Sequence, residues 1–239
     1  MRQRLVTVHL CAMLMVAVGS TLPAQEALTF KASGDKIEAG QSTTLSWVAQ
    51  GDAAFLTGIG KVKPSGEQVV RPLVPTTYVL VVESGNIIRT AALTVDVTGP
   101  RGASDFPEIN DFNTAPIVDQ RRGSKFTDFL DVVHKTLQDQ MSFSVRGDFL
   151  PRRPYVTLYT NKSPRSELIR PTDRGIRYRR VSYSVQVNER INGLIPYEIR
   201  TILEYQRTAE TEWHIERDDT IIRAAAEALR TTLPANIKP

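Results

Sequence analysis

The sequence predicts a mainly β protein built from two folded units, an N-terminal β-sandwich and a following α+β domain. Residues 26–98 consist of short runs rich in Val, Thr and Leu that are separated by Gly and Pro turns, which is typical of a sandwich. Residues 107–239 are patterned as helix, strands and helix, which predicts an antiparallel meander sheet with two helices. Residues 99–106, rich in Gly, Pro and small side chains, are the predicted linker.

Alternating hydrophobicity predicts three strands in the first unit. Thr43–Val48 places Leu45 and Trp47 on one face, and Thr77–Glu83 and Ala91–Val97 alternate in the same way. We expect these inward-facing side chains to form a core of their own, separate from the core of the second unit.

A longer pattern surrounds these strands. Residues 37–47 read I-E-A-G-Q-S-T-T-L-S-W, and residues 59–62, 76–80 and 93–97 continue it. This stretch, which lies within residues 26–98, resembles bacterial immunoglobulin-like modules. The resemblance implies a sandwich that serves as a spacer, an adhesive unit or an appended binding domain, and it carries no catalytic residues. The chain departs from antibody domains in that it lacks a cysteine pair and has its Trp in an early strand.

Two amphipathic helices frame the predicted sheet of the second unit. Residues 125–138, preceded by Ser124 as the expected cap, carry apolar side chains at helical spacing, and Thr220 is expected to cap a helix that runs to Arg230. Both helices are expected on the apolar face of the sheet, and no family is recognised in this unit. The predicted strands are Met141–Phe149, Tyr155–Thr160, Arg177–Asn188, Tyr197–Gln206 and, at an edge, Glu212–Glu216.

The first 24 residues predict a secretory signal peptide. Arg2 and Arg4 precede an apolar stretch, Leu10–Val18, and small residues follow it. We therefore expect export to the periplasm or the extracellular space, with a cleavage site that the pattern does not fix. The single cysteine, Cys11, lies in this segment, so the mature chain has no thiol for disulfides, catalysis or metal binding.

The charge of the chain argues against a nucleic-acid partner. The formal net charge is +4, and removal of Arg2 and Arg4 leaves 28 basic against 26 acidic residues, a net charge of +2. Such a field is too weak to indicate binding to a phosphate backbone. No second apolar run reaches membrane length, which predicts no integral membrane segment in the mature chain. The pattern sets no oligomeric state.

The sequence predicts no catalytic residue, no metal and no cofactor, because no motif for such a site is recognisable. His134 is expected on the polar side of its helix, and His214 follows Trp213 in a short strand. One alternative is a small carboxylate-dependent hydrolase, because acidic residues gather near Trp213 and glycoside hydrolysis uses paired carboxylates. A simpler interpretation is a solvent-facing strand and an acidic helix start. The acidic residues are Glu210, Glu212, Glu216, Asp218 and Asp219.

The most distinctive feature is the arginine-rich segment Arg165–Arg180, in which tyrosine is interleaved. Arginine beside aromatic rings can hold phosphate, carboxylate or sugar polymers. A simpler interpretation is a solvated loop that leads into a strand. The candidate ligand-binding residues are Arg170, Arg174, Arg177, Tyr178, Arg180 and Tyr183.

These patterns favour a non-enzymatic binding or interaction protein of the cell envelope or the extracellular space. In this interpretation the first unit positions the second, which recognises a protein or an envelope polysaccharide through the tyrosine-bearing face of its sheet. A carboxylate-dependent hydrolase and a binder of anionic polymers or polysaccharides are the alternatives.

Overall fold

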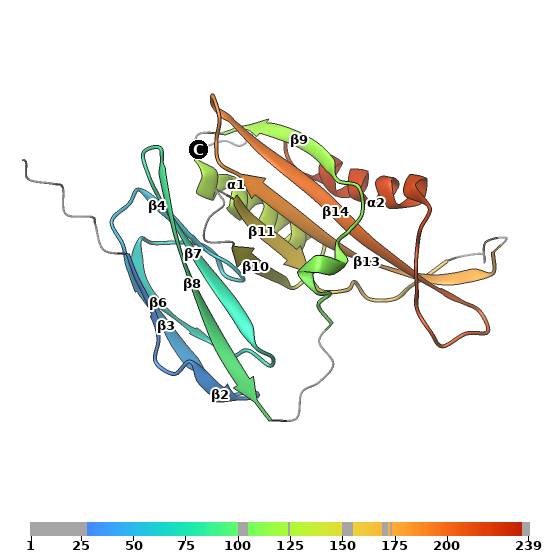
Figure 1. Cartoon of the computed structure of the whole chain (residues 1–239), viewed down its shortest axis with the longest axis horizontal. Helices are drawn as coiled ribbons and strands as arrows, with labels where there is room; N and C mark the ends of the chain where they lie inside the picture. Colours follow the sequence, from blue (N-terminus) through green and yellow to red (C-terminus); the bar gives the residue numbers. More distant parts are fainter. Residues whose placement is uncertain are drawn as a thin grey trace, which may run out of the picture.

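The computed structural model describes residues 28–99, 105–123, 125–149, 155–168, 172 and 174–235. The predicted signal peptide with Cys11, the expected cap Ser124 and the candidate Arg170 lie outside these ranges. The protein is mainly β, as predicted, with several antiparallel sheets and two α-helices in the described part. Its two units lie side by side (Figure 1), and we call residues 28–99 the first unit and residues 105–235 the second unit.

Two sheets make up the first unit. One has the order β1 (Thr29–Ala32), β3 (Thr43–Val48), β6 (Ser65–Val70). Leu45 and Trp47 of β3 point into a core shared with the second sheet, as predicted, because alternate residues of a strand face opposite sides. The second sheet has the order β2 (Lys36–Glu38), β8 (Ile87–Thr98), β7 (Thr76–Ser84), β4 (Ala53–Leu56), β5 (Gly60–Val62).

The sheet of the second unit contains the predicted antiparallel meander. Its order is β10 (Val145–Phe149), β11 (Tyr155–Thr160), β13 (Ile176–Asn188), β14 (Leu194–Arg207), β15 (His214–Ile215). Strand β10 begins four residues later than predicted, after Ser142 with a positive φ of 60°. The Asn192-Gly193 turn has positive φ at both residues, as the hairpin signal predicts.

Two strands of this sheet were not predicted. Strand β9 (Ile117–Arg122) pairs with the first half of β14, and the short β12 (Ser166–Glu167) pairs with β13. Strand β9 is rich in charge, as edge strands often are, and this composition hides it from a hydrophobicity pattern.

Both helices cover the same face of this sheet, behind its strands in Figure 1. Helix α1 (Phe126–Lys135) continues into one π-helical turn, Thr136–Gln140, and α2 spans Asp219–Thr232. The cap of α2 is Asp218 and not Thr220, since the Asp218 carboxylate accepts hydrogen bonds from the backbone of Thr220 and Ile221. The predicted apolar stripe of α1 is buried, and it comprises Phe126, Phe129, Leu130, Val133 and Leu137.

The predicted core of the first unit forms a cluster of its own, and in addition the other face of its five-stranded sheet joins the apolar cluster of the second unit, which was not predicted. Phe55 of β4 and Val79 and Val81 of β7 pack in the same cluster as α1 and the sheet of the second unit. Their neighbours in the chain, among them Leu56 and Leu80, face the core of the first unit instead. The five-stranded sheet of the first unit is therefore buried on both faces where α1 and β10 cover it. We call this contact the seam.

Candidate functional site: a pocket in the seam

The arginine-rich segment is largely neutralised by carboxylates of the same chain. Arg174 forms an ion pair of 2.7 Å with Glu216, Arg177 one of 2.7 Å with Glu167, and Arg180 one of 2.7 Å with Glu204. Two of the arginines also make cation–π contacts. The guanidinium of Arg165 lies 4.0 Å from the Tyr178 ring centroid, and that of Arg180 lies 4.1 Å from the Trp213 ring centroid.

Tyr183 does not join these arginines. It lies on the opposite, core-facing side of β13, where its ring packs edge-on against Phe143 and its hydroxyl donates to the Ala225 carbonyl at 3.3 Å. Burial raises the pKa of Tyr183 to about 12. Four of the candidates that the structure describes thus lie at the open end of the β13–β14 hairpin, opposite its turn: Arg174, Arg177, Tyr178 and Arg180. The fifth, Tyr183, lies in the core.

The acidic residues near Trp213 each have a structural role or face solvent. Glu216 is buried and accepts both hydrogen bonds of an Arg174 fork and two backbone N–H bonds. Burial opposes its ionisation, but these hydrogen bonds outweigh burial and hold the pKa of Glu216 below its ordinary value. Asp218 caps α2, and Glu212 is exposed. Glu216 and Asp218 are therefore engaged by groups of the same chain.

The outer face of the sheet of the second unit, which was expected to recognise a partner, is partly covered by residues 105–116. Phe112 of this segment is buried, and the Thr114 carbonyl accepts a hydrogen bond of 2.8 Å from Arg200 of β14. Phe106 packs edge-on against Tyr159 of β11 with ring centroids 6.0 Å apart. The predicted tyrosine-bearing face is therefore shared with the chain's own connection between the two units.

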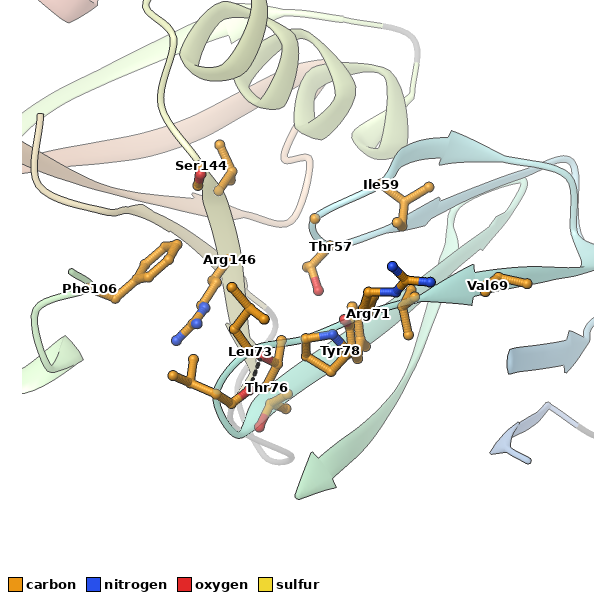
Figure 2. Close-up of a pocket in the computed structure, with 16 residues that line it drawn as sticks. Thr57, Ile59, Val69, Arg71, Leu73, Thr76, Tyr78, Phe106, Ser144 and Arg146 are labelled. Carbon is orange, nitrogen blue, oxygen red and sulfur yellow. Dashed lines mark hydrogen bonds between the residues drawn. The ribbon is translucent and has the colours of Figure 1, made fainter. Parts of the chain in front are cut away.

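A pocket of about 410 Å³ opens in the seam (Figure 2). The first unit supplies the β4–β5 turn, the end of β6 and the loop into β7, and the second unit supplies Phe106 and residues 144–146. Its walls are mostly apolar, with hydroxyl groups and two arginines, Arg71 and Arg146, and none of its lining residues is acidic. In Figure 2, Arg146 extends from β10 toward the loop that carries Leu73 and Thr76.

Arg146 is half-buried in the wall of this pocket. Its guanidinium carbon lies 3.8 Å from the centroid of the Phe106 ring. Burial lowers the pKa of Arg146, and the phenols of Tyr159 and Tyr78 offset this only in part. Within the described ranges no carboxylate forms an ion pair with Arg146. This guanidinium therefore differs from those of Arg174, Arg177 and Arg180, which are paired with carboxylates.

Close packing of Gly147 against Thr57 joins the two units beside the pocket. Thr57, in the β4–β5 turn, exchanges hydrogen bonds with Val79: its backbone N–H donates to the Val79 carbonyl at 3.0 Å and its Oγ1 accepts from the Val79 N–H at 2.8 Å. Gly147 of β10 lies against Thr57, where a β-carbon would come within 2.1 Å of Thr57 Cγ2. Only glycine permits this approach, so the sequence of β10 is adapted to contact with the first unit.

The seam also holds the start of α1. Lys125, at the N-cap position, provides no side-chain cap, and the buried carboxylate of Glu83 from β7 replaces it. Glu83 accepts hydrogen bonds from the backbone of Phe126 and Thr127 at 3.1 and 3.0 Å and from the Thr127 hydroxyl at 2.9 Å. A residue of the first unit thus satisfies the N-terminus of a helix in the second.

His134 lies in the seam as well, which corrects its expected position on the polar side of α1. It is 3% exposed, its ring packs edge-on against Phe55, and its Nε2 has no hydrogen-bond partner within the described residues. Burial lowers the pKa of His134, against the opposing effect of Asp131 and Asp139. Beside it, Asp131 accepts a hydrogen bond of 2.9 Å from the Lys61 backbone N–H.

No family model and no curated protein matches the chain. In the ranges that the structure covers, no helix is long and apolar enough to cross a membrane, and no three His, Cys, Asp or Glu side chains gather as metal ligands would. The geometry defines a mainly β protein whose two units are packed around an arginine-bearing pocket.

Sequence reasoning missed Arg71, Phe106 and Arg146, because the pocket forms only where the units meet. One local signal was present. Gly147 interrupts a predicted strand, and an isolated glycine in a strand often marks close approach of another backbone.

Proposed function

We propose that this chain is an exported binding protein of the cell envelope or the extracellular space, whose immunoglobulin-like first unit and α+β second unit together wall a ligand pocket. The observation that carries the proposal is the 410 Å³ pocket in the seam. Pockets of this size between domains are common sites for small ligands. The proposal of export rests on the signal-peptide pattern of residues 1–24.

The acidic residues support binding over catalysis. Glycoside hydrolysis requires one carboxyl group that is protonated and poised as an acid. Glu216 is instead stabilised as an anion by Arg174, and Asp218 is engaged at the start of α2. Binding of a protein or an envelope polysaccharide by the exposed surfaces of the second unit stays a prediction.

Thermal unfolding of the mature chain, residues 25–239, against a panel of small envelope components and metabolites tests the proposal. A ligand of the native state should raise Tm, because binding stabilises the folded form by about 2.7 kcal/mol at a hundred times its Kd. Amide shifts in an NMR titration should fall on Thr57–Tyr78 and Ser144–Arg146. Turnover of a substrate that is abolished by substituting one acidic residue near Trp213 would instead establish an enzyme.

A further inference from the structure

We propose that the pocket in the seam takes a carboxylate-bearing small molecule with an apolar body, and that Arg146 binds the carboxylate. This inference rests on the proposed binding function and adds the class of ligand. Three observations carry it: an unpaired guanidinium in the wall, an exposed apolar patch at the mouth, and the stacking that orients the guanidinium.

The first observation is the charge of the wall. A half-buried cation is normally paired, because leaving it without a counter-charge costs free energy. Arg180, whose side chain is 22% exposed, follows this rule with Glu204. Arg146 has only aromatic groups and phenols around it in the described structure, and the pocket lining contains no carboxylate. An anion from outside would supply the missing partner.

The second observation is the apolar surface of the pocket. Ile59, Val69 and Leu73 are all lining residues, and they are 36%, 61% and 65% exposed. Large apolar side chains that gather at one concave place mark a site for an apolar partner. Pro72, Val74 and Val145 extend this surface inward. A ligand that is only an anion would leave these walls in water, so its body must be apolar.

The third observation is the orientation of the guanidinium. Phe106 covers one face of Arg146 at 3.8 Å and is itself packed edge-on against Tyr159. Stacking on the face leaves the N–H groups in the plane of the fork, and this fork matches the two oxygens of a carboxylate. Arg71, whose Nε donates to Ser42 Oγ at 3.2 Å, adds a second positive charge to the lining.

Titration with sodium octanoate tests the proposal, with octanol as its neutral counterpart. The mature chain is followed by amide NMR, and the apparent Kd is measured at constant ionic strength. Octanoate should shift amides of residues 57–59, 71–78 and 144–146, and octanol should bind at least about tenfold more weakly, because a charge-assisted hydrogen bond contributes about 1.5–3 kcal/mol.

Single-residue variants test whether Arg146 supplies the charge that binds octanoate. Arg146→Gln should weaken octanoate binding at least about tenfold and leave octanol binding unchanged, with Arg146→Lys intermediate because lysine lacks the fork. Arg223→Gln, an equal change of charge on an exposed residue of α2, should have no effect. Thermal unfolding of each variant verifies that the fold is retained, and Arg146→Lys serves as the test if Arg146→Gln is unstable.

The outcomes separate this inference from the function on which it rests. Equal binding of octanol and octanoate, or octanoate binding that Arg146→Gln leaves intact, overturns the carboxylate assignment while the pocket remains a binding site. Octanoate shifts confined to the β13–β14 hairpin overturn it in favour of the arginine-rich segment. Absence of any shift with octanoate also overturns it, whereas the binding function is then decided by the ligand panel.

Discussion

Charged groups have different partners in the seam between the units and at the open end of the β13–β14 hairpin, which carries the arginine-rich segment. At the hairpin end, Arg174, Arg177 and Arg180 pair with carboxylates of the same unit, and Arg180 also lies over the ring of Trp213. In the seam four ionisable groups are buried, and each contacts the other unit: Glu83 the start of α1, His134 the Phe55 ring, and Asp128 and Asp131 both Lys61. The dense charge that stands out in the sequence is therefore mostly paired within one unit, whereas the buried ionisable groups of the seam join the two units.

The largest effect is expected from Glu83→Ala. The substitution leaves two backbone N–H groups and the Thr127 hydroxyl buried without their acceptor. Each unsatisfied group costs about 1–3 kcal/mol, and we expect a total loss of about 3–5 kcal/mol in the free energy of unfolding. Denaturant unfolding measures it. Glu67→Gln, at an exposed position of β6, is the control, and a loss at Glu83 no greater than this control would contradict the capping role.

Gly147→Ala should break the same contact from the other side. The added β-carbon would meet Thr57 Cγ2 at 2.1 Å and Thr57 Cβ at 2.6 Å, so β10 and the β4–β5 turn must separate. Overpacking of this kind costs about 1–3 kcal/mol. The matched control is Gly34→Ala, where the nearest heavy atom would be 3.9 Å away. If both variants unfold at the same denaturant concentration, the close approach in the seam is wrong.

A smaller effect, dependent on pH, is expected from His134. Because burial lowers its pKa in the folded state, the unfolded chain binds the proton more readily. Stability from neutral His134 is present above the ordinary histidine pKa of about 6.5 and is lost as the pH falls below it toward the folded-state pKa. His134→Gln should flatten the decrease of Tm between pH 7 and pH 5. Parallel Tm profiles for wild type and His134→Gln would exclude this contribution.

The smallest effect is expected at the hairpin end. The side chains of Arg177 and Glu167 are 41% and 54% exposed, and ion pairs at the surface contribute little to stability because solvent screens them. Arg177→Gln should leave the denaturant midpoint of unfolding close to that of the wild type and leave octanoate binding unaltered. A marked loss of stability on this substitution, or of octanoate affinity, would mean that the two regions are not distinct in the way described.

The sequence predicts those parts of the fold that depend on local patterns. The central strands β3, β11, β13 and β14 and the apolar stripe of α1 follow from alternation and helical spacing. The charged edge strand β9 carries no such pattern. The cap of α1 was assigned to a residue beside the helix, but Glu83 lies 43 positions before Phe126, and no local rule indicates so distant a partner.

The candidate site was less predictable, because its walls come from separate segments. Residues Tyr78–Val82 form an unbroken apolar run, which indicates a strand buried on both faces and would have suggested that the first unit is covered. That signal and Gly147 point to a contact between the units. The place of Arg146 in the pocket depends on Phe106, the last residue of the predicted linker, and only the folded geometry shows it.

Native-state hydrogen exchange of β7 and α1 tests most directly whether the two units form one cooperative body. The shared cluster predicts that the slowest amides of both elements open with the same free energy, and that Gly147→Ala lowers this free energy equally in both. Amides of α1 that exchange far faster than those of β7, or a Gly147→Ala variant that destabilises one element alone, would show two independent units and contradict the account.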